Sequence, residues 1–166
     1  MAGPSDFALA ALALSVGRSL RRAGLTIATA ESCTGGLIAK CLTDIAGSSD
    51  YFERGWVTYS NDAKHDELGV RAATLARHGA VSEAVALAMA RGALRRCPAR
   101  VSIAVTGIAG PAGGTPEKPV GMVWIAWGLQ REDGIQAYAR LFRFRGGRNA
   151  IRRQAAVAAL EGLPSS

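Results

Sequence analysis

Residues 25–36, LTIATAESCTGG, predict a strand, a glycine-rich turn and the start of a helix, in that order. The run 25–30 is rich in β-branched residues, which favour a strand. The two glycines then open a helix over 35–45, where apolar residues recur on one side. Units of this kind build layered α/β domains, whose ligands bind outside the carboxyl ends of the strands.

Further helices and strands alternate over most of the chain, and the last two strands follow each other directly. Ser5, Asn61 and Ser82 are the expected N-caps, Gly24 is expected to end the first helix, and a turn at 133–134 is expected to join the last two strands. We therefore expect a three-layer α/β/α sandwich with a mixed, mostly parallel sheet, formed as one domain over residues 1–166. The expected helices are 5–23, 61–68, 71–77, 82–96 and 147–160, and the expected strands are 55–59, 100–105, 120–127 and 136–144.

Composition narrows the class of protein. The chain has 166 residues, of which 49% are hydrophobic, so it can bury a core and is not a disordered segment. Its three cysteines are too few for a disulfide framework, which favours a reducing cytoplasm. No apolar run reaches the ~18 residues of a membrane span, so no membrane partner is expected. The net charge of +7 comes from arginines spread among acidic residues without interleaved aromatics, which favours anionic ligands over nucleic acid.

The first candidate site is the turn at 30–36. Ser32 stands between strand and helix, where a nucleophile would be exposed, and the helix start offers N–H groups to negative charge. The stretch is neither a phosphate-binding P-loop nor a dinucleotide fingerprint, and it lacks the flanking glycines of a hydrolase elbow. Two alternatives stay open: Ser32 or Thr34 only caps the helix, or Cys33 is the nucleophile.

The second candidate is the segment 58–64, where Tyr59 ends a strand and Lys64 follows within a turn of helix. A buried lysine loses its proton readily and can then act as a base toward a serine, directly or through a tyrosine hydroxyl. The alternative is a solvated Lys64 that pairs with Asp62 or Glu67.

The third candidate is the glycine-rich loop that follows the strand over 100–105. Its glycines would face the Ser32 turn if the two strands are parallel, and long loops without regular structure are often functional. The alternative is a plain connection. His65 and His78 have no ligand companions at suitable spacing, so no metal site and no cofactor are expected.

Taken together, these stretches resemble the CinA C-terminal domain family, and the resemblance covers roughly residues 9–160. Ala112 departs from the family pattern, since a further glycine is expected there. The matching stretches are 29–36 (TAESCTGG), 47–49 (GSS), 59–64 (YSNDAK), 79–82 (GAVS), 104–111 (AVTGIAGP) and 116–121 (PEKPVG).

The resemblance implies a nicotinamide-nucleotide amidase, which hydrolyses the carboxamide of nicotinamide mononucleotide to nicotinate mononucleotide and ammonia. It implies Ser32 as nucleophile, with Tyr59 and Lys64 as the pair that activates it. Amides at the Gly35–Gly36 helix start are expected to hold the oxyanion. The expected substrate-binding residues are Thr34, Gly35, Gly36, Ser48, Ser49, Thr106, Gly107 and Gly114, and the phosphate is placed among Ser48, Ser49, Thr106, Gly107 and the 113–114 loop.

Two other classes of function remain open. One is a module that binds a nucleotide without cleaving it, in a regulatory, competence-related role, and the other is a nucleic-acid-binding protein. The expected partner is a small nucleotide substrate, with no nucleic acid and no membrane. A homo-oligomer is expected, and a dimer is the favoured form.

Overall fold

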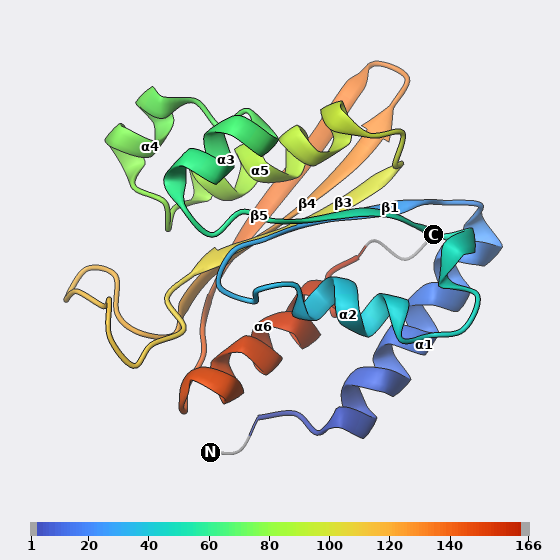
Figure 1. The fold of residues 1–166 in the computed structure, drawn as a ribbon, viewed down its shortest axis with the longest axis horizontal. Helices are drawn as coiled ribbons and strands as arrows, with labels where there is room; N and C mark the ends of the chain where they lie inside the picture. The colour runs from blue at the N-terminus through green and yellow to red at the C-terminus, as the bar shows by residue number, and fades with distance from the viewer. Residues whose placement is uncertain (1–2, 164–166) are drawn as a thin grey trace.

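The computed structural model describes residues 3–163, so both ends of the expected domain 1–166 lie outside the described residues. A five-stranded sheet has the order β2-β1-β3-β4-β5, in which only β4 runs against the others. Figure 1 shows α1, α2 and α6 on one face of the sheet and α3, α4 and α5 on the other. The expected three-layer sandwich with a mixed sheet is confirmed. The strands are β1 (Ile27–Glu31), β2 (Phe52–Val57), β3 (Val101–Gly107), β4 (Met122–Arg131) and β5 (Gly134–Arg143).

Local capping explains where the helices begin. Ser5 and Ser82 accept hydrogen bonds from the first turns of α1 and α5, as predicted, and Gly24 ends α1 in the left-handed conformation. Ser60, not Asn61, caps α3, because its side chain accepts from the amide of Ala63. The helices are α1 (Asp6–Ala23), α2 (Leu37–Thr43), α3 (Asn61–Leu68), α4 (Ala72–His78), α5 (Glu83–Arg96) and α6 (Arg148–Glu161), with a short 3₁₀ turn η1 (Ser48–Asp50) before β2.

The position of β2 differs from the expected strand 55–59. It begins at Phe52, which pairs with Ile27, and it ends at Val57. Tyr59 therefore lies in the connection to α3 and not at the end of a strand. The reason is that β2 is an edge strand with mostly exposed residues, so its start carries no apolar alternation.

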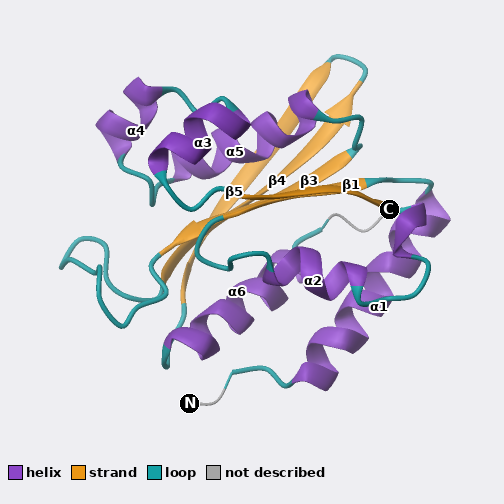
Figure 2. Cartoon of the chain, in the orientation of Figure 1, coloured by secondary structure: helices purple, strands orange, loops and turns teal. Residues whose placement is uncertain are grey.

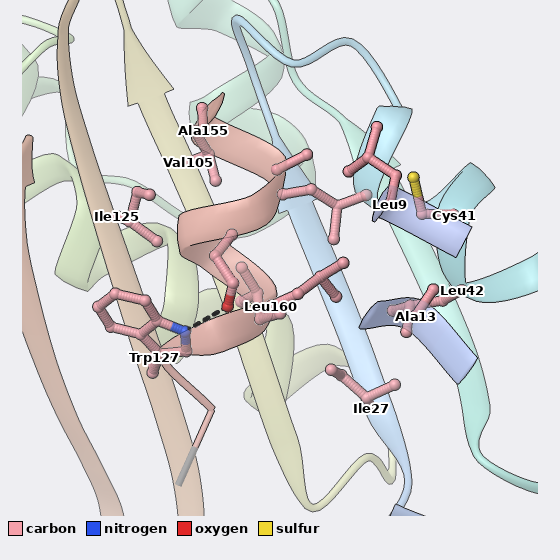
Figure 3. Packing of buried hydrophobic residues seen from close by; sticks show 14 of the residues in the cluster. Leu9, Ala13, Ile27, Cys41, Leu42, Val105, Ile125, Trp127, Ala155 and Leu160 are labelled. Carbon is pink, nitrogen blue, oxygen red and sulfur yellow. Dashed lines mark hydrogen bonds between the residues drawn. The ribbon is translucent and has the colours of Figure 1, made fainter. Parts of the chain in front are cut away.

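Two apolar clusters, one on each face of the sheet, hold the layers together. The cluster on the α1, α2 and α6 side includes Trp127, whose indole N–H donates to the carbonyl of Ala159 on α6 at 2.8 Å (Figure 3). The other cluster packs α5 against the small residues Ala28, Ala30 and Ala104 of β1 and β3. Small residues let α5 lie close to the sheet, which fixes the elements that carry the site.

The carboxyl ends of the three parallel strands meet at one edge. Glu31 is level with Val57 of β2 and with Val105 of β3, so the residues that follow each strand are neighbours. The loop 108–121 projects from this edge as a segment without helix or strand (Figure 2). Within residues 3–163, no helix combines the length and apolar character needed to cross a membrane.

Candidate active site

The turn after β1 holds Ser32 at the edge where the strands end. The amide of Ser32 donates to the carbonyl of Val105 at 3.0 Å, which ties the turn to β3. Gly35 and Gly36 follow with φ of 59° and 91°, a backbone region that side chains disfavour. The Ser32 side chain is 8% exposed and lines a cavity of about 260 Å³. Ser32 is therefore held rigidly and still faces open space.

Lys64 reaches Ser32 from α3. Its Nζ lies 3.0 Å from Ser32 Oγ and donates to the backbone carbonyls of Thr58, at 2.8 Å, and Tyr59, at 3.2 Å. The side chain is 1% exposed and forms no ion pair within residues 3–163, so the alternative of a solvated, paired lysine is wrong. Burial lowers the pKa of Lys64, because a low-dielectric surrounding disfavours the charged form.

Tyr59 lines the same cavity and contributes its backbone carbonyl to this arrangement, while its hydroxyl is bound to Arg148. The residue is 58% exposed, and its hydroxyl accepts a hydrogen bond from Arg148 Nη2 at 2.8 Å. Within the described residues, that hydroxyl forms no hydrogen bond to Ser32 or Lys64. A relay through the Tyr59 hydroxyl stays a prediction.

The amides expected to hold the oxyanion are already occupied. The buried carboxylate of Glu31 accepts hydrogen bonds from Gly36, Ile38 and Ala39, at 2.8 to 3.1 Å, and Gly35 donates to the carbonyl of Ser32. The expectation that the amides of Gly35 and Gly36 hold the oxyanion is therefore wrong, because both amides already donate to oxygen atoms of the protein. The two glycines shape the turn, and the carboxylate of Glu31 accepts the N–H groups at the start of the helix.

Two other amides are available beside the nucleophile. Within residues 3–163, the N–H groups of Cys33 and Thr34 donate no hydrogen bond to another residue. The carbonyl of Thr34 is held by Arg152 Nη2 at 2.8 Å, which steadies this part of the turn. The amide that follows a nucleophilic serine is a common oxyanion donor in hydrolases.

Of the remaining expected substrate-binding residues, some line the cavity beside Ser32 and others do not. Thr106 and Gly107 line the cavity, and the Thr106 hydroxyl donates to the carbonyl of Ala80 at 2.9 Å. Gly114 does not line it, although Gly113 does, because Gly114 packs its backbone against Val120.

Ser48 and Ser49 lie at the opposite end of the sheet. They form η1, which precedes the first residue of β2, and that residue pairs with the first residue of β1. The Ser48 hydroxyl donates to the carbonyl of Thr43. The structure therefore does not bring Ser48 and Ser49 to the Ser32 cavity, because these serines stand at the amino ends of the strands, and phosphate contacts at these two residues stay a prediction.

Burial disfavours Cys33 as the nucleophile. The thiol lines the same cavity, but burial raises its pKa to about 11. At neutral pH almost none of it is thiolate, the form that attacks. A larger depression of about 830 Å³ lies between α1 and the end of α6, but no nucleophile and base of this kind meet among its lining residues.

Arg148 also lines the cavity, although it is not among the residues predicted from the sequence. It is the first residue of α6, and it donates to the carbonyl of Gly110 and to the Tyr59 hydroxyl, both at 2.8 Å. A cation is unfavourable at the positive end of a helix dipole, and that misfit is the signal that could have identified it.

Comparisons with known proteins show which proteins this chain is similar to. The family model described as the CinA C-terminal domain matches residues 9–166. The nicotinamide-nucleotide amidohydrolase PncC of Escherichia coli K12 is 54% identical over 159 residues, which are 96% of this chain and 94% of that one. A protein of the same name from Pseudomonas putida is 50% identical, over 92% of each chain. The crystal structure of competence/damage inducible protein CihA from Agrobacterium tumefaciens superposes with a TM-score of 0.90 at 48% identity, covering 98% of this chain and 96% of that one.

Proposed function

The chain belongs to the CinA C-terminal domain family, and from that membership we propose that it is an amidohydrolase of nicotinamide mononucleotide. The products are nicotinate mononucleotide and ammonia. One observation carries the chemistry: a buried lysine, with no acidic partner among residues 3–163, lies 3.0 Å from a serine hydroxyl inside a cavity. Serine and lysine in such contact form a nucleophile and its base.

Neutral Lys64 is suited to accept the serine proton. A neutral amine has two N–H bonds, which the carbonyls of Thr58 and Tyr59 accept, and one lone pair, which remains for the Ser32 hydroxyl. Transfer of the proton to Lys64 frees the Ser32 oxygen to attack the carboxamide carbon. The carbonyl electron pair moves to the oxygen, which the amides of Cys33 and Thr34 stabilise; one such donor contributes about 2.7–4 kcal/mol.

Collapse of this intermediate breaks the carbon–nitrogen bond. The ammonium of Lys64 returns its proton to the leaving nitrogen, so ammonia departs and an ester with Ser32 remains. Lys64 is then neutral again and takes a proton from water, which hydrolyses the ester to nicotinate and restores Ser32. Each proton taken is given back, and the residues named supply every step.

The test is incubation with nicotinamide mononucleotide, measuring ammonia and the acid product. Ser32→Ala should bind the nucleotide and lose turnover, while Cys33→Ala, a change at the adjacent position, should retain it. A variant Ser32→Ala with wild-type rates, or loss confined to Cys33→Ala, would refute the serine mechanism. A wild-type protein that binds the nucleotide and releases no ammonia would instead be a binding module.

The proposal includes the state in which the protein works. We propose one domain over residues 1–166, which the single continuous sheet of the described residues supports. We also propose that the protein is a homo-oligomer, with a dimer as the favoured form. Sedimentation equilibrium tests this by measuring the molecular mass in solution. The free cysteines at 33, 41 and 97 support a reducing, cytoplasmic setting.

A further inference from the structure

Arg152 lies on α6 and carries a positive charge that the proposed mechanism does not use. The residue is partly buried, and within residues 3–163 no carboxylate lies within ion-pair distance of it. Its Nε is buried without a hydrogen-bond partner among those residues, while its Nη2 donates to the carbonyl of Thr34 at 2.8 Å. That carbonyl also accepts from the amide of Leu37 at 3.2 Å. A partly buried cation without a paired anion is costly, so we expect its charge to act on the turn that contains Thr34.

Two hydrogen bonds connect this guanidinium to the residue that follows the nucleophile. The carbonyl of Thr34 belongs to the same peptide group as the amide of Gly35, and that amide donates to the carbonyl of Ser32 at 3.0 Å. The carbonyl of Ser32 in turn belongs to the same peptide group as the amide of Cys33. In a trans peptide the C=O and N–H bonds point in opposite directions, so these hydrogen bonds are aligned head to tail. The chain that begins at Arg152 therefore ends on the N–H of Cys33.

The last N–H of this chain is available to a ligand. Within the described part of the chain, the amide of Cys33 donates no hydrogen bond to another residue, and Cys33 lines the cavity together with Ser32. Aligned hydrogen bonds polarise one another, and a charged donor makes a stronger hydrogen bond than a neutral one. The Cys33 N–H is therefore a stronger donor than an isolated amide at this position would be.

Two further observations show how close Arg152 lies to this turn. A Cβ atom added at Gly35 would lie 3.3 Å from Arg152 Nη2, so the lack of a side chain at Gly35 leaves room for the guanidinium. Burial raises the pKa of the Cys33 thiol to about 11, and the positive charge of Arg152 acts on the same thiol in the opposite direction. The electric field of Arg152 thus reaches residue 33.

We propose that Arg152 is a positioning residue of the reaction, which orients and polarises the Cys33 amide through the peptide groups 34–35 and 32–33; this inference rests on the proposed function. Arg152 is not among the residues that line the cavity, so it acts through the backbone and not by contact with the substrate. The carbonyl oxygen of the substrate becomes negative only after Ser32 attacks. The contribution of Arg152 should therefore appear in the transition state and not in substrate binding.

Steady-state kinetics of ammonia release from nicotinamide mononucleotide compare the wild type with Arg152→Met and Arg152→Lys. We expect Arg152→Met to lower kcat about tenfold to a hundredfold and to leave KM within about twofold, because an oxyanion donor is weakened but not removed. Arg152→Lys keeps a charged donor and should recover part of kcat. An unchanged kcat in Arg152→Met, or an equal loss of kcat in Arg152→Lys, would overturn the proposal.

Arg153→Met is the matched control, because it removes the same kind of side chain one position later on α6. Arg153 pairs with Asp6 at 2.7 Å and donates to the carbonyl of Pro4, so it holds the start of α1 and not the turn after β1. Thermal unfolding should show a lowered Tm for this variant, while its kcat stays at the wild-type value. If kcat falls equally in Arg152→Met and Arg153→Met, Arg152 serves only the stability of the fold and the proposal fails.

An NMR measurement makes the inference independent of turnover. In isotope-labelled protein, the amide proton shifts of Cys33 and Gly35 report how strongly each N–H is polarised. Both should move upfield in Arg152→Met, and neither should move in Arg153→Met. If they respond in this way and the wild type releases no ammonia, the polarised chain is supported and only the proposed function fails. Unchanged shifts in Arg152→Met refute the role of Arg152 whatever the activity.

Discussion

Gly92 on α5 controls how closely α3, which carries Lys64, packs against α5. A Cβ atom added at Gly92 would lie 2.1 Å from the backbone oxygen of Leu68, the last residue of α3. Ordinary contact begins at 3.4 Å, so Gly92→Ala forces a displacement of about 1.3 Å. The obstacle is backbone and cannot rotate away, so α3 or α5 must move.

Both stability and rate should respond to this displacement. Overpacking costs roughly 1–3 kcal/mol, and replacing a mid-helix glycine by alanine returns up to about 1 kcal/mol. We therefore expect the free energy of unfolding to fall by about 1–2 kcal/mol, which lowers Tm by about 2–8 °C in a chain of this size. If α3 moves, the 3.0 Å contact between Lys64 and Ser32 opens beyond hydrogen-bond reach. Turnover should then fall by about 10²-fold.

The assays are thermal unfolding and ammonia release at saturating substrate, with Gly128→Ala as the matched control. A Cβ at Gly128 would lie 2.5 Å from Ser102 Oγ, at the amino end of β3 and away from the site. This control should lose stability and keep kcat. A Gly92→Ala variant with lowered Tm and full turnover would show that α5 yields and that Lys64 does not depend on this contact. Equal loss of kcat in both variants would refute the reasoning as well.

Three further predictions concern protonation, thiol chemistry and metals. Because Lys64 must be neutral to act as base and burial lowers its pKa, kcat should rise with pH through an ionisation below 10.5. Arginine stays protonated, so Lys64→Arg should lower kcat by about 10²–10⁴-fold. A kcat that does not change with pH below 10.5 excludes Lys64 as base. The unfolded chain binds more protons between that lowered pKa and 10.5, so the free energy of unfolding should rise with pH there, and Lys64→Met should abolish this contribution. Cys33, with a pKa raised to about 11, should resist a thiol reagent at pH 7 in the native protein and react once it is unfolded, as followed by absorbance. Dialysis against a chelator should leave the rate unchanged, since no three potential ligands gather within residues 3–163; loss that zinc restores would reveal a missed site.

Local signals were enough for most of the fold. Ser5, Ser82 and Gly24 identified helix ends because a cap depends on neighbours in the chain, and the alternation of elements indicated the layers. The start of β2 was not predictable in this way. Its residues are held by pairing with β1 at an exposed edge, and pairing leaves no periodic mark in a polar strand.

The candidate site shows the same division. Ser32 and Lys64 could be selected from the sequence because each follows a strand, and the family resemblance pointed to both. Whether Lys64 was solvated or buried could not be decided, since that depends on how α3 packs against α5 and the segment that precedes α3.

The sequence alone determined which residue types are present and which strand each one follows. Only the tertiary structure decided which residues are in contact. The carboxylate of Glu31 accepts hydrogen bonds from the amides of Gly36, Ile38 and Ala39. Arg148, 84 residues after Lys64 in the chain, lines the same cavity as Lys64. Ser48, in contrast, lies at the end of the sheet opposite to Ser32, before the first residue of β2. The physical reason is the direction in which paired strands run: a segment that precedes a strand lies at its amino end, and a segment that follows a strand lies at its carboxyl end. Which strands pair in parallel, and so bring their carboxyl ends together, does not follow from the spacing of residues along the chain.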